Sequence, residues 1–95
     1  MTHTQSIFRI AVQATEPDQY ANEPQKARQY VAQLHTDVAS IRAAIETGDT
    51  DTALDILSKS RVRLYSLIDR GPCRTPGSLC VMRGIVDLIA SAIRL

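Results

Sequence analysis

Aromatic residues are scarce in this chain of 95 residues, which has no Trp, one Phe and three Tyr. A hydrophobic core must therefore be built from Leu, Ile, Val and Ala, which pack well between helices. The length allows one domain, near the lower end of what folds alone.

Residues that could carry chemistry are also few. Cys73 and Cys80 are seven positions apart, and His3 and His35 lie far from both in the sequence. This spacing is not that of a zinc site, and in a reducing compartment we expect free thiols and a surface or boundary His35. Gly-rich phosphate loops, H-E-x-x-H motifs and nucleophile elbows are absent from the sequence. We therefore expect no enzyme, no metal and no cofactor.

The chain has no apolar run long enough to cross a bilayer. Its first fourteen residues carry no basic leader, and their apolar run is broken by Arg9. We expect a cytoplasmic protein. Its charge is divided unevenly, with a net −4 in residues 1–58 and +5 in residues 59–95. Such asymmetry can steer a partner or let the two halves attract each other.

Apolar spacing predicts three helices at about 24–47, 51–70 and 76–94. The first has a heptad-like seam of apolar residues, and Pro and Gly separate the segments. The seam consists of Ala27, Val31, Leu34, Val38, Ile41 and Ile45. We expect an all-α domain over residues 24–95, an antiparallel helical hairpin or three-helix bundle.

Residues 44–57, AIETGDTDTALDIL, resemble the turn between the two helices of a tetratricopeptide repeat. Gly48 and Asp49 stand at the turn, with Ala53 and Leu57 at the packing positions. The likeness implies two antiparallel helices. Because it occurs once and solenoids need several copies, we interpret it as an ordinary helix pair.

Residues 1–23 are expected to form an extended arm and linker. Phe8, Ile10 and Val12 alternate with polar or small residues, which favours a short strand whose apolar side contacts the core or a partner.

The segment 78–95 carries two apolar stripes, more than a surface helix needs. We assign the first, Leu79, Met82, Val86, Ile89 and Ile93, to the core. The second is predicted to lie exposed and to form a homodimer or partner interface. It consists of Val81, Ile85, Leu88, Ala92 and Leu95. The alternative is that the N-terminal arm covers this stripe within one chain.

These features indicate a small protein that acts by binding another protein. We expect an inhibitor of the antiactivator type, which occludes an interface of a larger regulatory protein. A small nucleic-acid-binding regulator is the second interpretation, because residues 59–94 hold seven basic side chains. An architectural subunit or chaperone is the third. Nucleic-acid binding would weaken steeply with salt, whereas an apolar protein interface would not.

Overall fold

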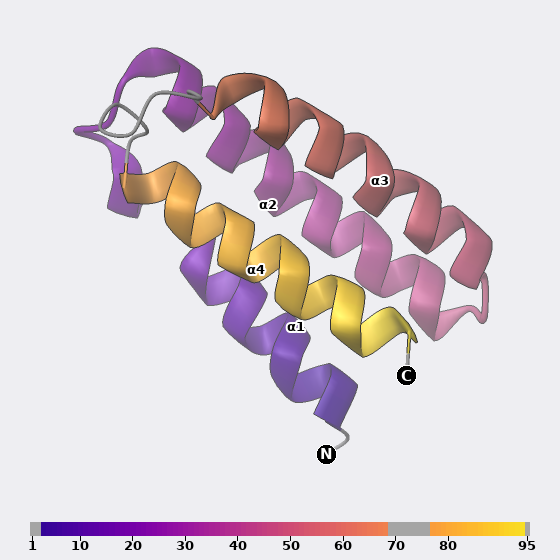
Figure 1. Ribbon diagram of the computed structural model, residues 1–95. Coiled ribbons are helices and arrows are strands. Elements are labelled where there is room, and N and C mark those ends of the chain that lie inside the picture. The colour runs from indigo at the N-terminus through magenta and orange to yellow at the C-terminus, as the bar shows by residue number, and fades with distance from the viewer. Residues whose placement is uncertain (1–2, 69–76, 95) are drawn as a thin grey trace.

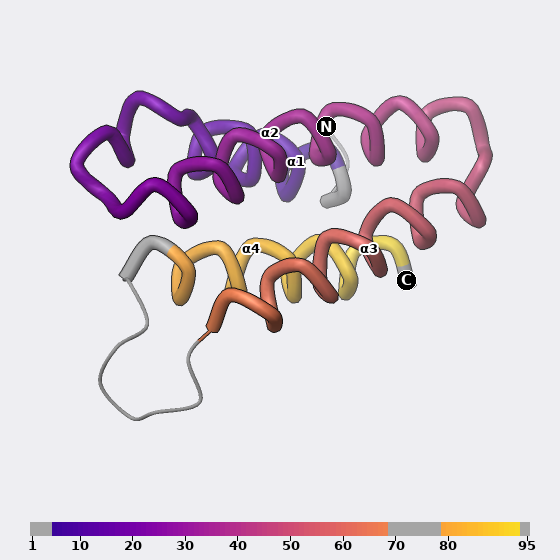
Figure 2. The backbone as a smooth tube through the Cα atoms, turned by 90° about the horizontal axis from the view of Figure 1, so that it is seen from above, coloured from indigo at the N-terminus to yellow at the C-terminus, as the bar shows by residue number. Residues whose placement is uncertain are grey.

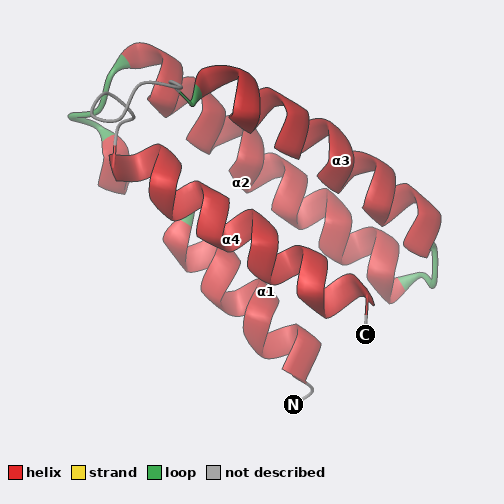
Figure 3. Ribbon diagram, viewed as in Figure 1, coloured by secondary structure: helices red, strands yellow, loops and turns green. Residues whose placement is uncertain are grey.

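The computed structural model describes residues 3–68 and 77–94, in which all regular structure is helical (Figure 3). The helices are α1 (His3–Ala14), a short 3-10 helix η1 (Pro17–Tyr20), α2 (Gln25–Glu46), α3 (Thr50–Leu67) and α4 (Gly77–Arg94). The all-α class is thus confirmed. The expected number of long helices was too low, because a fourth one precedes the predicted domain.

The four α-helices alternate in direction and form two layers. Figure 1 shows α1 beside α4 and α2 beside α3, with both termini at the same end of the molecule. Seen from above, α1 and α2 form one layer and α3 and α4 form the other (Figure 2). Each helix packs against the next one around the bundle, α2 also contacts α4, and one apolar core lies between the four helices.

The hairpin of α2 and α3 is formed by an apolar seam on α2, a glycine in the turn and a capping residue at the start of α3. The first five residues of the predicted seam are buried and the sixth, Ile45, is partly buried. Gly48 has a φ of +80°, a left-handed conformation that only glycine adopts without strain. Asp49 then caps α3, because its Oδ1 accepts a 3.2 Å hydrogen bond from the Thr52 backbone N–H.

The predicted extended N-terminal arm is wrong, since Ile7, Phe8 and Ala11 lie on one face of helix α1 and are buried in the core. A lone strand among helices would leave its backbone N–H and C=O groups without ladder partners, whereas a helix pairs its own. Alternation over seven residues does not separate the two states. In the helix Phe8 and Ile10 no longer share a face, and Ile10 is 50% exposed.

The first stripe of α4 belongs to the core, as expected. Leu79, Met82, Val86 and Ile89 are buried, and Ile93 is partly buried. This face of α4 meets the core between α1 and α3, which both pack against it.

Candidate interaction surface

The second stripe of α4 is not the exposed patch that the sequence predicts. Ile85 and Ala92 are buried and Leu88 is partly buried, which leaves only Val81, 49% exposed. Leu95 lies outside the described residues. The expectation fails because α1 is a helix that packs along α4, and Ile85 and Ala92 belong to the core that the helices share. Two copies cannot pair through side chains that already face their own core.

The three residues predicted to make contacts from the N-terminal arm also differ in their exposure. Phe8 is buried at 2% exposure, Val12 is partly buried, and Ile10 points to solvent. Phe8 therefore serves the fold, and Ile10 is the member of the group that is free to meet another molecule.

Exposed large hydrophobic side chains gather instead on α3. Leu54, Val62 and Tyr65 are 37%, 67% and 45% exposed, and all three lie on this one helix. They line an open groove of about 490 Å³, together with Leu57, Ser58 and Arg61. We use the name outer face of α3 for the exposed residues Leu54, Ser58, Val62 and Tyr65 together with the partly buried Arg61.

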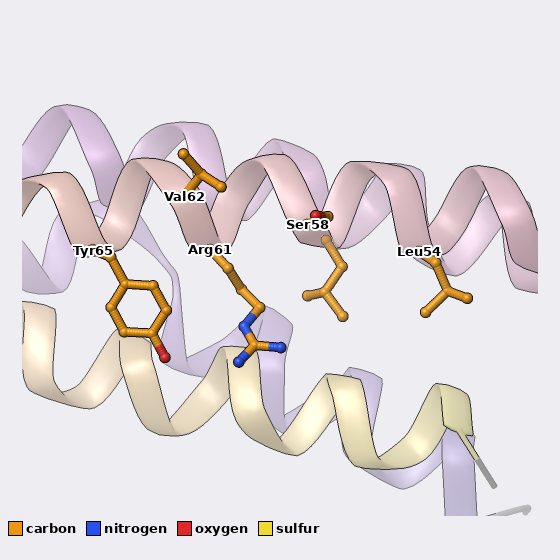
Figure 4. Close-up of a pocket in the computed structure, with 6 residues that line it drawn as sticks. Leu54, Ser58, Arg61, Val62 and Tyr65 are labelled. Carbon is orange, nitrogen blue, oxygen red and sulfur yellow. The ribbon is translucent and has the colours of Figure 1, made fainter.

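The side chains of this face spread to two sides of the helix. Figure 4 shows Leu54, Arg61 and Tyr65 directed toward α4, with Val62 on the opposite side. The Arg83 guanidinium of α4 lies over the Tyr65 ring, 5.8 Å from its centroid. A cation at this distance interacts favourably with the electron-rich ring face. The contact fixes the orientation of Tyr65 at one end of the groove.

Charge changes sign along α3. Asp51 and Asp55 are in its first half, and Lys59, Arg61 and Arg63 in its second. Lys59 Nζ lies 3.1 Å from Asp55 Oδ2, and both side chains remain more than half exposed. Arg63 turns to the other side of the helix, where it binds Asp37 of α2. The exposed apolar residues thus extend from the acidic half of α3, with Leu54, into its basic half, with Val62 and Tyr65.

Another groove, of about 420 Å³, is lined by residues of α2 and α3. Tyr30 is one of these residues, and its hydroxyl donates a 3.1 Å hydrogen bond to the Ser60 carbonyl and lies 3.1 Å from Ser60 Oγ. Burial raises the pKa of the Tyr30 phenol, although the Ser60 hydrogen bond and nearby Arg63 partly oppose this. Because its hydroxyl is hydrogen-bonded to Ser60, Tyr30 links α2 to α3, and we assign it a structural role.

The histidine and cysteine residues considered in the sequence analysis can also be placed, apart from His3 and Cys73. His35 Nδ1 lies 2.9 Å from the hydroxyl of buried Thr15, which also donates to the Ala11 carbonyl at 2.7 Å. His35 therefore ties the end of α1 to α2. Cys80 is an exposed free thiol, and Cys73 lies outside the described residues. The described part of the chain contains no group of three or more side chains suited to bind a metal, and none of its helices is long and apolar enough to cross a membrane.

Comparisons with known proteins add no relative. No family model matches the chain, and no curated protein or solved structure shows significant similarity to it. The candidate surface therefore depends on the chain's own geometry.

The stripe of α4 that the sequence favours is mostly buried, whereas the exposed apolar side chains of α3 also follow a pattern that is visible in the sequence. Leu54, Arg61 and Tyr65 form a row separate from the buried row of Ala53, Leu57, Ser60 and Leu64. Both rows follow helical spacing, so α3 also has two stripes. The stripe on α4 is longer and more apolar, so the sequence alone favours it over the stripe on α3.

Proposed function

We propose that this protein is a small non-enzymatic regulator that binds a larger regulatory protein through the outer face of α3. It would thereby occlude an interface of that larger protein. The observation that carries the proposal is the clustering of Leu54, Val62 and Tyr65 on one exposed helix beside an open groove. Exposed apolar side chains gathered in one place are typical of association sites. Tyr and Arg, both present here, are enriched where interfaces are tightest.

The shape of the surface supports a protein partner rather than a small molecule. Small ligands are usually enclosed by a cavity that buries most of their surface. The groove on α3 is open and follows the helix from Leu54 to Tyr65, three turns apart. An amphipathic helix of a partner fits such a groove by placing side chains at i, i+3 and i+4 spacing along it. The inhibitor class is an analogy from this physical type.

The basic residues of α3 favour this interpretation over nucleic-acid binding. Arg63 donates to Asp37 at 2.7 Å, and Lys59 lies 3.1 Å from Asp55. Both cations are therefore already partly neutralised by a carboxylate, which weakens their attraction for phosphates. Two carboxylates would also stand near the bound backbone and repel it. An acidic protein surface could meet Arg61, which lines the groove, and Arg83, which contacts Tyr65.

Affinity capture from the native host tests the proposal. The double variant Leu54→Asp and Val62→Asp places two charges on the outer face without touching buried side chains, so we expect unchanged circular dichroism and loss of the captured protein. The control is Ile10→Asp, an equally exposed apolar residue on α1. Wild type and control should retain the same protein.

Val81→Asp extends the comparison to the exposed remainder of the α4 stripe. If this variant loses the captured protein while the α3 double variant keeps it, the interaction surface is on α4 and the proposal is wrong. High salt provides a second readout, since an apolar interface should survive conditions that release nucleic acid.

A further inference from the structure

The outer face of α3 is complementary to itself. Leu54 lies in the acidic first half of the helix, with Asp51 and Asp55, whereas Val62 and Tyr65 lie in the basic second half, with Lys59 and Arg61. Ser58, small and exposed, stands near the middle of the row. A surface with opposite charges at its two ends matches a copy of itself after a half-turn, as two-fold symmetric interfaces require.

We propose that the outer face of α3 binds the same face of a second copy of this chain, with the two helices antiparallel and the two-fold axis near Ser58. The inference rests on the surface named in the proposed function and identifies what covers it before a larger partner binds. In this arrangement Leu54 of one copy lies against the Arg61 and Tyr65 end of the other.

Charge decides the orientation. In an antiparallel pair centred near Ser58, Asp55 of each copy lies beside Lys59 of the other, so two attractive contacts form across the axis. In a parallel pair Asp55 would face Asp55 and Lys59 would face Lys59, and like charges directly opposed are unfavourable. Because Asp55 and Lys59 already form a pair within one chain, each carboxylate gains a second cation without losing the first.

The size of the contact indicates a weak dimer. A single helix pair buries less than the roughly 1,600 Å² of a standard stable interface. Self-association should therefore be reversible and fall in the micromolar range. A larger partner that covers more of the groove would displace the second copy, so the dimer protects the apolar face while the partner is absent.

Complementation between two charge variants tests the inference. Asp55→Lys gives a chain with two positive charges at these positions, and Lys59→Asp gives a chain with two negative charges. Each variant alone should dimerise about tenfold more weakly than wild type, because both symmetric contacts become repulsive. An equimolar mixture should regain association, since every contact across the axis is then attractive. Sedimentation equilibrium measures this against the monomer mass of 10.5 kDa.

The matched control is the pair Arg42 and Glu46 on α2, which is also exposed and also spaced i,i+4, with a distance of 3.2 Å. Arg42 borders a groove with α1 residues and so lies away from the outer face of α3. Arg42→Asp and Glu46→Lys repeat the same intrachain charge changes, and neither they nor their mixture should alter the dimer constant by more than about twofold.

Two results would overturn the inference. One is a wild-type mass that stays at 10.5 kDa up to millimolar concentration. The other is a mixture of Asp55→Lys and Lys59→Asp that associates no better than either variant alone. Failure of the proposed function gives a different result, in which the wild type dimerises and complements as expected while the α3 double variant still captures the same host protein.

Discussion

Arg63 of α3 donates a 2.7 Å hydrogen bond to Asp37 Oδ2 of α2. Gln33 Nε2 donates to the other carboxylate oxygen at 3.0 Å. The Asp37 side chain is only 11% exposed, whereas that of Arg63 is 46% exposed. Asp37 belongs to the acidic first part of the chain and Arg63 to its basic second part. This ion pair is therefore one place where the two oppositely charged parts attract each other within the fold.

Removing the cation of this pair should cost more than removing the whole pair. Arg63→Gln leaves a nearly buried carboxylate with Gln33 as its remaining side-chain partner, and we expect a loss of about 1–3 kcal/mol in the free energy of unfolding. Adding Asp37→Asn removes the charge that needs a partner, so the double variant should recover part of this loss. Urea unfolding measures both. Equal stability of Arg63→Gln and wild type would show that the pair contributes nothing.

Tyr30 gives the fold a dependence on alkaline pH. Burial raises the pKa of its phenol in the folded chain above the unfolded value of about 10. The folded state then holds its proton more tightly, so this contribution to stability is complete below about pH 10 and is lost as the pH rises through the higher folded value. Tyr30→Phe should cost about 1 kcal/mol at neutral pH and should lose less stability than wild type above pH 10. Identical pH slopes for the two proteins would contradict this.

The hairpin of α2 and α3 could be predicted from sequence because every local signal agrees. The apolar seam, Gly48 and the capping Asp49 each point to the same two helices and the same turn. The end of α3 and the start of α4 were also close to expectation, although the loop between them lies outside the described residues.

The N-terminal segment could not be predicted because its pattern is too short to choose one period. Ile7, Phe8 and Ala11 fit a helical face, while Phe8, Ile10 and Val12 fit a strand. Tertiary packing decides between them, since α4 offers a second apolar stripe that a helix can cover. Because α1 is a helix that packs along α4, the stripe of α4 that was expected to be exposed is mostly buried. Whether an apolar stripe is exposed depends on which other helices pack against it. The local sequence of one helix does not determine this.

Asp49 should make the start of α3 sensitive to acid. Its carboxylate accepts hydrogen bonds from the Thr52 side-chain hydroxyl and backbone N–H, and both lower its pKa. The lowered folded pKa means that the cap stabilises the protein above the unfolded value of about 4 and that this is lost as the pH falls through the folded value. Asp49→Ala should therefore lower the Tm at pH 7 but have little effect near pH 2. Asp18→Ala, an exposed carboxylate in η1, serves as a control. An equal loss at both pH values would contradict the cap.

Helix α1 should prove necessary for the fold, unlike a peripheral arm. Phe8→Ala empties a site that is 2% exposed, and we expect a loss of about 3–5 kcal/mol. Ile10→Ala, at 50% exposure on the same helix, should cost less than about 0.5 kcal/mol. The difference arises because only Phe8 faces the core. An extended arm would put both side chains on one side and give them similar costs.

Deleting residues 1–13 should go further, since it removes nearly the whole of a helix that packs along α4. The truncated chain should then lose cooperative unfolding or associate through the second stripe of α4, as circular dichroism and sedimentation would show, whereas a cooperative monomer of unchanged stability would mean that α1 is dispensable.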